Sequence, residues 1–298
     1  MDNLPFQISV IVPAHRAEKT ICRALKSVAN QTRIPAEIIV VDDGSKDGTA
    51  LAAEAMRDCM GGINLKVLRQ DHQGAGAARN TALREARLEY VAFLDADDEW
   101  LPKKLERSMQ VISQTDSILV SHDYIRRERN GRETIINGCS RKFSRCNEPY
   151  LELYRLGYIA TSGVVVRREA VIAAGGFDET LQAAQDFALW LKMLSKPNVS
   201  FVVFPGALLR YNRTRGSISS YTERRLHCTL QIARQFFPTI VERSSFPLLI
   251  LWYRIIAVHY EAVCAYVGQR RIGAALGVIL RSPINLIITT IFCRINQK

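Results

Sequence analysis

Residues 8–41 read ISVIVPAHRAEKTICRALKSVANQTRIPAEIIVV, and the alternation within this stretch points to the fold class. A short β-branched run at 8–12 is followed by a helical pattern at 20–31 and by a second β-branched run at 37–41. Two strands joined through a helix indicate a parallel pair, because parallel strands need a crossover connection. The stretch therefore predicts a β–α–β unit.

The same alternation continues to about residue 100. Helical patterns at 49–60 and 76–87 alternate with strand-like runs at 65–70 and 90–94. We expect an α/β fold with a Rossmann-like, doubly wound, mostly parallel sheet, in which ligands bind beyond the carboxyl ends of the strands. The loops that follow those ends are PAHR (13–16), DDGSKDGT (42–49), DHQGAG (71–76) and DADDEW (95–100).

The patterns between residues 102 and 222 are less regular. The polar, basic stretch 126–148 predicts a hairpin followed by a mobile loop. The remaining expectations for this part are a strand at 161–170, a turn at the paired glycines of AAGGFDE (173–179), a helix at 181–196 with Trp190 in the core, and a strand pair at 201–213.

Length and composition limit the classes of function. With 298 residues, of which 48% are hydrophobic and 23% charged, the chain is long enough for a sizeable core and is not disordered. Its seven cysteines are scattered without a CxxC pair, which predicts reduced thiols in a cytoplasm-like compartment and no structural zinc. The N-terminal apolar run suits a first strand rather than a signal peptide. No nucleic-acid motif accompanies the net charge of +11, so phosphate ligands or an anionic membrane are expected to explain it.

The last part of the chain is apolar and basic. The segments 246–267 and 272–292 are long enough to span a membrane, but Arg254 lies in the first and Arg281 near the middle of the second. A central Arg costs about 2.5–3.5 kcal/mol on insertion scales, which weakens the spanning interpretation. Residues 222–298 hold ten Lys or Arg and three Asp or Glu. We expect helices that lie on an anionic membrane surface; a soluble helical domain, a homo-oligomer interface and a true span stay open.

Two of the four loops have more than one interpretation. DDGSKDGT suits a turn and a helix N-cap, yet its two adjacent carboxylates also suit the N–H or hydroxyl groups of a ligand. QGAGAARN (73–80) contains a GxG typical of dinucleotide folds, although Arg79 replaces the third glycine. Glycine and Arg79 at a helix start also suit a phosphate or base. We interpret His72 as a solvated loop residue.

The loop DADDEW gathers four acids in a basic protein. Asp98 and Glu99 suit the first turn of a helix, where the macrodipole favours acids, and Pro102 suits an early helical position. Asp95 and Asp97 are one residue apart and are predicted to point the same way off the strand end. Such a carboxylate pair suits Mg²⁺ or Mn²⁺, which in turn bridges a substrate diphosphate.

In their order and spacing, these motifs resemble one family. SVIVPAHRAEKTICRALKSVANQT, EIIVVDDGSKDGT, GAGAARNTAL and YVAFLDADDEWLP resemble glycosyltransferase family 2, the inverting enzymes with the GT-A fold. GGFDETLQAAQDFALWLKM and YNRTRGSIS extend the resemblance over about residues 7–220. It implies a GT-A domain at 1–222, with a nucleotide-sugar-binding half at 1–100 and an acceptor-side half at 101–222, followed by a basic helical extension at 223–298.

The resemblance implies donor-binding roles for single residues. Pro13, Ala14 and His15 stand in the loop that cradles the nucleotide base, where the family usually has Tyr-Asn from position 15 onward. Asp43 matches the carboxylate that binds a uracil ring. Arg79 lies where a basic residue contacts the nucleotide.

The resemblance also implies the metal ligands and the catalytic base. Asp95 matches a ligand of ribose and metal, and Asp97 matches the direct ligand of Mn²⁺ or Mg²⁺. Asp186 matches the catalytic aspartate, which follows Gln185 here and commonly follows Glu in the family. In the diphosphate-closing loop 211–219, Arg213 or Arg215 offers a cation where the family often has His, and Arg213 is the expected contact.

The function implied is that of a metal-dependent inverting glycosyltransferase. It would move a sugar from a nucleotide-sugar donor, most simply a UDP-sugar, to a hydroxyl of a lipid-linked or polysaccharide acceptor in bacterial surface-glycan synthesis, as a peripheral protein on the cytoplasmic face of the plasma membrane. Asp186 would take the proton of the acceptor hydroxyl. Two alternatives stay open: a nicotinamide-dependent oxidoreductase built on GAGAAR, and a non-catalytic nucleotide-sugar-binding membrane scaffold.

Overall fold

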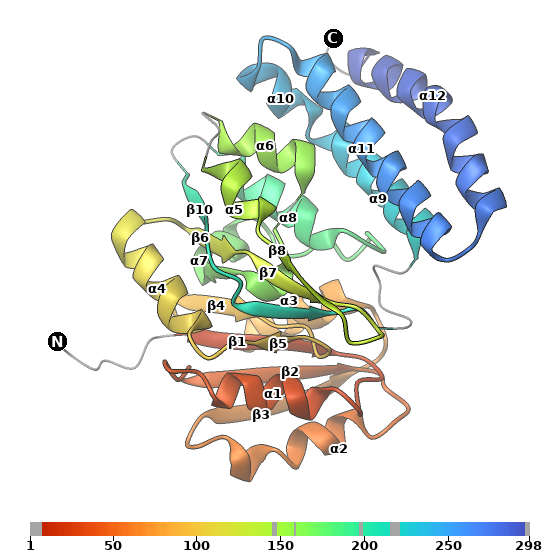
Figure 1. The fold of residues 1–298 in the computed structure, drawn as a ribbon. Coiled ribbons are helices and arrows are strands. Elements are labelled where there is room, and N and C mark those ends of the chain that lie inside the picture. Colours follow the sequence, from red (N-terminus) through yellow and green to blue (C-terminus); the bar gives the residue numbers. More distant parts are fainter. Residues whose placement is uncertain (1–7, 145–147, 158, 197–198, 215–220, 296–298) are drawn as a thin grey trace. The chain divides into compact units, whose positions relative to one another are not determined.

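The structure is a computed structural model that describes residues 8–144, 148–157, 159–196, 199–214 and 221–295 (Figure 1). Contacts within the chain define two compact units. Unit 1 comprises Met1–Arg145, Ile159–Glu179 and Lys196–Thr214, and unit 2 comprises Cys146–Tyr158, Thr180–Ser195 and Arg215–Lys298.

The main sheet of unit 1 has seven strands in the order β10-β6-β9-β4-β1-β2-β3. All neighbouring strands run parallel except β9, which is antiparallel to β4 and to β6. The strands are β1 (Ile8–Ala14), β2 (Glu37–Asp43), β3 (Asn64–Gln70), β4 (Tyr90–Phe93), β6 (Leu119–His122), β9 (Val165–Arg167) and β10 (Phe201–Phe204). The mostly parallel α/β sheet predicted from the sequence is confirmed.

The helices of unit 1 follow from amphipathic patterns in the sequence. In α1 (Ile21–Ala29), for example, Ile21, Leu25 and Val28 share one face and are buried in the same core as the β-branched residues of β1 and β2. The other helices are α2 (Thr49–Glu54), α3 (Ala75–Glu85), α4 (Lys104–Thr115), α5 (Gly138–Phe143) and α7 (Arg168–Ala173), with 3₁₀ turns η1 (Arg57–Cys59) and η2 (Thr161–Gly163). The helix expected at 49–60 therefore ends early, at Glu54.

A second sheet in unit 1 has the order β5-β11-β7-β8, formed by β5 (Glu99–Trp100), β11 (Leu209–Asn212), β7 (Tyr124–Arg127) and β8 (Glu133–Ile136). The hairpin predicted after residue 126 is confirmed, but the loop predicted after it is wrong in part, because α5 occupies 138–143.

The strand pair predicted at 201–213 is also wrong in its pairing. β10 pairs with β6 in the main sheet, whereas β11 pairs with β5 and β7 in the small one. Gly206 lies between them with φ near +125°, a backbone conformation open mainly to glycine, and lets the chain leave one sheet and enter the other.

The segment predicted as a strand at 161–170 is strand only at β9, with η2 before it and α7 after it. The turn predicted at the paired glycines is confirmed, since Gly175 and Gly176 both have positive φ. A Cβ atom on Gly176 would lie 2.6 Å from the Asn80 side-chain oxygen, which accepts a hydrogen bond from the Phe177 N–H. Glycine is therefore required here by space as well as by conformation.

Unit 2 is helical, with α6 (Pro149–Leu156), α8 (Gln185–Leu194), α9 (Thr222–Gln235), α10 (Phe237–Arg243), α11 (Pro247–Gly268) and α12 (Ile272–Ile295). Trp190 is 1% exposed, which confirms its predicted place in the core. Arg254 of α11 is buried, with its guanidinium 4.5 Å from the centre of the Phe187 ring. The Tyr154 hydroxyl donates to the Ala233 carbonyl at 2.7 Å. Arg254, the charged residue that argues against a membrane-spanning α11, therefore lies in the interior of this unit.

Lys104 and His122 are basic side chains buried in unit 1. Lys104 lies 4.0 Å from the centre of the Trp100 ring, its ammonium donates to the Val164 carbonyl, and burial holds its pKa well below the ordinary range. His122 donates through Nδ1 to the Asp123 carbonyl at 2.7 Å. Burial first, and then the charge of Lys104, lower the pKa of His122 to about 3. Folding therefore favours the neutral imidazole.

We predict that His122 makes the protein sensitive to mild acid. Between an unfolded pKa of about 6.5 and the folded pKa of about 3, the unfolded chain binds a proton that the folded chain does not, so the free energy of unfolding falls as pH falls. The free energy of unfolding is measured with urea at pH 7 and at pH 5. Its decrease between the two pH values is expected to be about 2 kcal/mol smaller in His122→Gln than in the parent. Equal losses in the two proteins contradict this prediction, and the exposed His227→Gln serves as the control.

Candidate functional site

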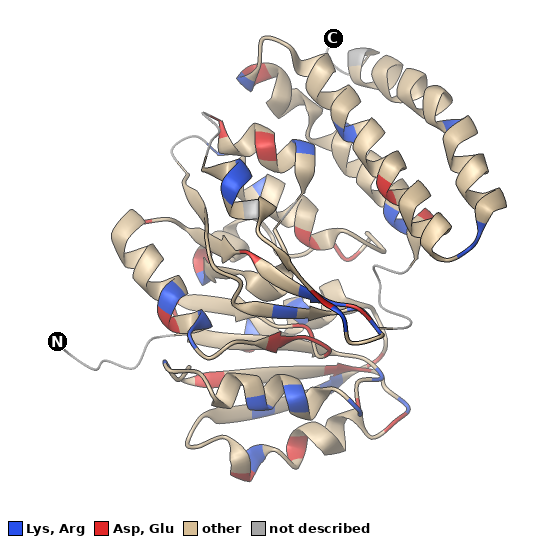
Figure 2. Cartoon of the chain, viewed as in Figure 1, with Lys and Arg blue, Asp and Glu red and all other residues tan. Residues whose placement is uncertain are grey.

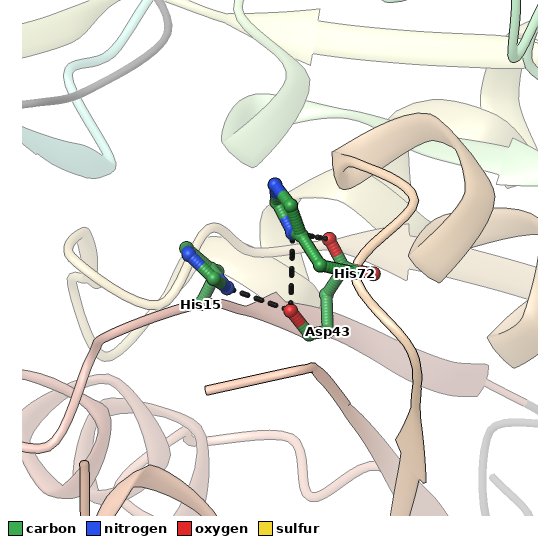
Figure 3. Close-up of side chains that lie close together, drawn as sticks. All are labelled: His15, Asp43 and His72. Atoms are coloured by element: carbon green, nitrogen blue, oxygen red, sulfur yellow. Dashed lines mark hydrogen bonds and ion pairs between the residues drawn. The ribbon is translucent and has the colours of Figure 1, made fainter. Parts of the chain in front are cut away.

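The carboxyl ends of β1, β2, β3 and β4 lie at one edge of the main sheet, because these strands are parallel neighbours. Pro13 and Ala14 are buried at the end of β1, and His15 follows them at the surface. Asp43 ends β2, and His72 stands in the loop after β3. These elements bring His15, Asp43 and His72 together (Figure 3).

Asp43 is buried, and its carboxylate accepts four hydrogen bonds. Oδ1 accepts from the Gln70 side chain at 2.8 Å and from the Gln73 N–H at 2.9 Å. Oδ2 accepts from the Gly74 N–H and from His72 Nδ1, both at 2.8 Å. Burial by itself would raise the pKa of Asp43, but these bonds together outweigh it, and the pKa lies below the ordinary value. Asp43 is therefore held as a carboxylate.

The GxG motif has a structural explanation in these contacts. Gly74 has φ near +97° and precedes α3, so its N–H and that of Gln73 point from the helix start to Asp43. The positive end of the helix thus faces a carboxylate of the chain itself. This motif therefore requires no dinucleotide.

The imidazoles of His15 and His72 stack on one another, with centroids 4.2 Å apart and an interplanar angle of 27°. Each Nδ1 faces the Asp43 carbonyl oxygen, at 2.6 Å from His15 and 3.2 Å from His72. A carbonyl only accepts, so both Nδ1 atoms carry hydrogen. The side chain of His72 is 59% exposed, as predicted, but it is bonded and stacked rather than merely solvated.

His15, Asp43 and His72 also offer ligand atoms within 4.8 Å of one another, as a metal site would require. A metal ion needs ring nitrogens with free lone pairs. Both Nδ1 atoms donate hydrogen bonds here, and the Asp43 carboxylate is saturated with donors. The Nδ1 atoms and the carboxylate are thus engaged with one another, and only the Nε2 atoms of the two imidazoles keep a free lone pair.

Arg79 and Asp95 form a pair at the next loop. Arg79 is only 6% exposed, and its Nη2 donates to Asp95 Oδ1 at 2.5 Å while its guanidinium lies 5.3 Å from the Phe177 ring centre. The Asp95 N–H donates to the Ser162 hydroxyl at 3.1 Å. One oxygen of Asp95 is thus committed to Arg79.

The sequence-based interpretation of Asp98 is wrong. Helix α4 begins only at Lys104, and Asp98 is 1% exposed. Its Oδ2 accepts from the Ser162 hydroxyl at 2.6 Å, and its Oδ1 accepts from the Asn212 N–H at 2.9 Å. Asp98 is therefore a buried link between the acidic loop, η2 and β11.

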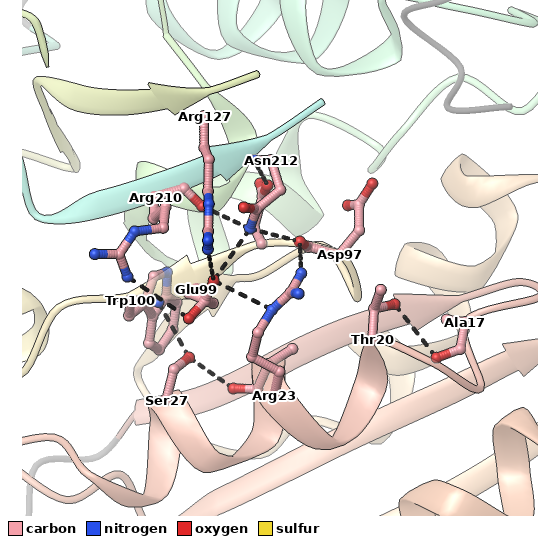
Figure 4. Close-up of polar contacts among 12 residues, drawn as sticks. Ala17, Thr20, Arg23, Ser27, Asp97, Glu99, Trp100, Arg127, Arg210 and Asn212 are labelled. Carbon is pink, nitrogen blue, oxygen red and sulfur yellow. Dashed lines mark hydrogen bonds and ion pairs between the residues drawn. The ribbon is translucent and has the colours of Figure 1, made fainter. Parts of the chain in front are cut away.

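Glu99 is not in a helix start either, because it lies in β5. Figure 4 shows three arginines around its carboxylate: Arg23 at 3.1 Å, Arg210 at 3.6 Å and Arg127 at 3.9 Å. Arg23 also donates to the Asp97 carbonyl at 2.8 Å, as does the side chain of Asn212. The backbone of the acidic loop is thereby held from both sides.

Asp95 and Asp97 lie beyond the end of β4 at Phe93, so a loop, not strand alternation, orients them. The Thr214 hydroxyl donates to Asp97 Oδ2 at 2.6 Å. Burial first, and then the charge of Asp95, raise the pKa of Asp97. Burial and the charges of Asp97 and Asp95 raise that of Asp98 well above the ordinary range. Carboxylate oxygens gathered in this way are the kind of ligand that a hard divalent cation prefers.

The remaining predicted residues lie in two places. Arg213, at the end of unit 1, is exposed, with Nη1 3.3 Å from Glu128. Arg215 lies outside the described residues. In unit 2, Asp186 stands in the first turn of α8 and accepts from the Phe187 N–H, and the buried Gln185 donates to the Leu181 carbonyl.

Comparison with known proteins identifies the family. The model of the family "Glycosyl transferase family 2" matches residues 9–174. The chain belongs to glycosyltransferase family 2. It is therefore a glycosyltransferase, and the oxidoreductase and non-catalytic alternatives are wrong.

This family 2 enzyme is similar to curated bacterial relatives. It is 31% identical over 219 residues to WfgD of Escherichia coli, a UDP-Glc:alpha-D-GlcNAc-diphosphoundecaprenol beta-1,3-glucosyltransferase, with 72% of this chain and 80% of WfgD covered. It is 30% identical over 223 residues to TuaG of Bacillus subtilis, a putative teichuronic acid biosynthesis glycosyltransferase, with 74% and 84% covered.

Solved structures confirm the GT-A fold. S. aureus TarS 1-349 in complex with UDP-GlcNAc superimposes with a TM-score of 0.68 at 23% identity, over 93% of this chain and 81% of TarS 1-349. The mannosyltransferase PcManGT of Pyrobaculum calidifontis, in complex with GDP-Man and Mn²⁺, has a TM-score of 0.65 at 18% identity, over 99% and 89% of the two chains.

Sequence reasoning missed the residues that support the acidic loop of this glycosyltransferase. Ser162 and Asn212 carry no motif that points to their contacts with Asp98, because both lie far from it in the sequence. The one available signal was electrostatic: a third acid beside Asp95 and Asp97 needs a buried partner or a cation.

We predict that Asp98→Ala lowers the free energy of unfolding by about 2–4 kcal/mol, because it leaves the Asn212 N–H and the Ser162 hydroxyl without their acceptor. The exposed Asp58→Ala, on η1, is the matched control and is expected to change stability by less than about 0.5 kcal/mol. Chemical denaturation of both variants makes the measurement. Equal small effects would show that the Asp98 bonds contribute little.

Proposed function

We propose that this family 2 enzyme moves a sugar, with inversion, from a UDP-sugar to a hydroxyl of a lipid-linked or polysaccharide acceptor in bacterial surface-glycan synthesis. The observation that carries the proposal is the pair of acids Asp95 and Asp97, which follow β4 at the same sheet edge as Asp43. The names of WfgD and TuaG support the class of acceptor. In this proposal residues 1–100 bind the donor, 101–222 face the acceptor and 223–298 form the extension.

On the donor side, Pro13, Ala14 and His15 cradle the base and Asp43 accepts a hydrogen bond from its ring N–H. The lowered pKa of Asp43 supports this role, because it keeps the group an acceptor. Arg79 contributes through Asp95, whose orientation it sets, and Arg213 offers a cation to the diphosphate.

Asp95 and Asp97 would hold Mn²⁺ or Mg²⁺. When bound, such an ion stabilises the charge that develops on the diphosphate leaving group. The oxygen-only ligand set and the raised pKa of Asp97 support this assignment. Arg23 and Asn212 keep the carboxylates in place by fixing the Asp97 carbonyl.

Asp186 acts as the general base that takes the proton from the acceptor hydroxyl as the anomeric carbon is attacked. Its place in the first turn of α8, with Oδ1 accepting from the Phe187 N–H, sets the direction of the carboxylate. The proton passes to a carboxylate oxygen, and the bond between the sugar and the diphosphate breaks as the new glycosidic bond forms.

A thermal-shift panel of UDP-glucose, UDP-N-acetylglucosamine and GDP-mannose with MnCl₂ tests the identity of the donor. Transfer and hydrolysis assays then use the nucleotide sugar that raises the melting temperature of the protein.

We predict that Asp186→Asn lowers the transfer rate about 10²–10⁴-fold while donor binding persists. Asp97→Ala is expected to lower the rate at least about 100-fold and to abolish the Mn²⁺-dependent shift. Asp58→Ala is the control, and full transfer by Asp97→Ala or Asp186→Asn would overturn the assignment.

We further propose that α11 and α12 place the enzyme on the cytoplasmic face of an anionic membrane. Both helices are long and apolar enough to cross a membrane. In the apolar segment Ile272–Cys293 of α12, only 17% is buried. Figure 2 shows long uncharged stretches in both helices. An apolar stripe runs along α12 at helical spacing: Leu276, Leu280, Ile284, Ile287 and Ile291, all more than half exposed. Such a stripe near the basic turn at 270–271 suits lipid headgroups and acyl chains.

Vesicle co-sedimentation tests this surface. The Leu280→Glu, Ile287→Glu double variant is expected to bind phosphatidylglycerol vesicles at least about tenfold more weakly than the parent, because two apolar side chains no longer enter the lipid. Leu51→Glu, at an exposed position of α2, is the matched control. If the parent protein does not bind the vesicles, the proposal is contradicted. If the parent is a dimer and the double variant is a monomer, the stripe is an interface with a second copy of the chain.

A further inference from the structure

His72 makes the two contacts that a nucleotide base would make in the proposed donor site. Its flat ring stacks on His15 at 4.2 Å, and its Nδ1–H donates to Asp43 Oδ2 at 2.8 Å. Figure 3 shows the imidazole against both residues. A uracil ring likewise offers a flat face and a ring N–H. His72 therefore contacts Asp43 and His15, the two residues that the proposed function assigns to the base.

The Asp43 carboxylate has no acceptor capacity left for a base. A carboxylate accepts about four hydrogen bonds, and those from Gln70, His72, Gln73 and Gly74 fill both oxygens. A base N–H can bond to Asp43 only if one of these donors leaves.

Of the four donors, His72 is the one free to leave. The N–H groups of Gln73 and Gly74 belong to the backbone that leads directly into α3, so neither can rotate away as a side chain can. Gln70 belongs to β3, and its other side-chain atom, Oε1, accepts from the Thr81 hydroxyl at 2.7 Å. The side chain of His72, by contrast, is 59% exposed and stands in a loop. Rotation of this one side chain exposes both Asp43 Oδ2 and a face of His15.

We infer that His72 is an intramolecular competitor of the nucleotide base, which closes the base site in the free enzyme and must swing out when the donor binds. The inference rests on the proposed function, because it takes Asp43 and His15 as the base contacts. A residue that merely lined the base site would weaken donor binding when it is removed. His72, as a competitor, is expected to do the opposite, so that its removal strengthens donor binding. Gly44 allows the His72 loop to come this close, since a Cβ at position 44 would lie 2.7 Å from the His72 backbone nitrogen.

Calorimetric titration of UDP in the presence of Mn²⁺ tests the inference. His72→Ala is expected to bind UDP about three- to tenfold more tightly than the parent, because one hydrogen bond and one stacking contact no longer compete. His72→Phe keeps a ring but not the Asp43 bond, so its affinity is expected to lie between the two. Asp71→Ala, at the exposed neighbouring position, is the matched control and leaves affinity unchanged.

A second readout follows the ring itself. The chain has five histidines, so their imidazole signals can be assigned by NMR through single substitutions. Addition of UDP with diamagnetic Mg²⁺ is expected to shift the His72 signals to those of a solvated imidazole. Weaker or unchanged binding by His72→Ala, or His72 signals that do not move, overturns the inference.

The outcomes separate this inference from the proposed function. In one outcome, UDP binds the parent, binds Asp43→Ala more weakly and binds His72→Ala no more tightly than the parent. This result would support the donor site and contradict only the competitor role of His72. If UDP binds none of the proteins, both proposals are contradicted. Tighter binding by His72→Ala together with weaker binding by Asp43→Ala supports both.

Discussion

The acidic loop of unit 1 depends on one buried carboxylate, that of Asp98. Its oxygens join η2 of the main-sheet region to β11 of the small sheet, through Ser162 and the Asn212 N–H. Burying an acid beside Asp95 and Asp97 is unfavourable, and the raised pKa of Asp98 reflects it. Donors from η2 and from β11 nevertheless converge on this carboxylate.

Two kinds of acid therefore stand at the same sheet edge. Asp43 is surrounded by N–H donors, which lower its pKa and fix it as an acceptor. Asp97 is instead largely buried, and burial first, and then the charge of Asp95, raise its pKa. The difference comes from environment alone, since the residue type is the same. In the proposed function, the base and the metal–diphosphate would therefore bind at different positions along one edge.

Local patterns account for what could be predicted. The β-branched runs and the helical spacing of Ile21, Leu25 and Val28 depend on neighbours in sequence, so the main sheet and α1 were predictable. Asp98 and Glu99 were misassigned because acids near a proline fit a helix start equally well by local rules. Their partners, such as Asn212, which is 114 positions from Asp98, are invisible to those rules. His72 carries no motif, so its stacking on His15 could not be predicted either.

Motif order and residue periodicity are properties of the linear chain, and they establish the family, the parallel sheet and the identity of the acids at its edge. The burial of those acids, the saturation of the Asp43 carboxylate with donors and the cover that His72 provides over the proposed base site follow from the tertiary structure alone. Burial and hydrogen bonding set the charge state of Asp43, Asp97 and Asp98, and both arise from segments that meet only after folding.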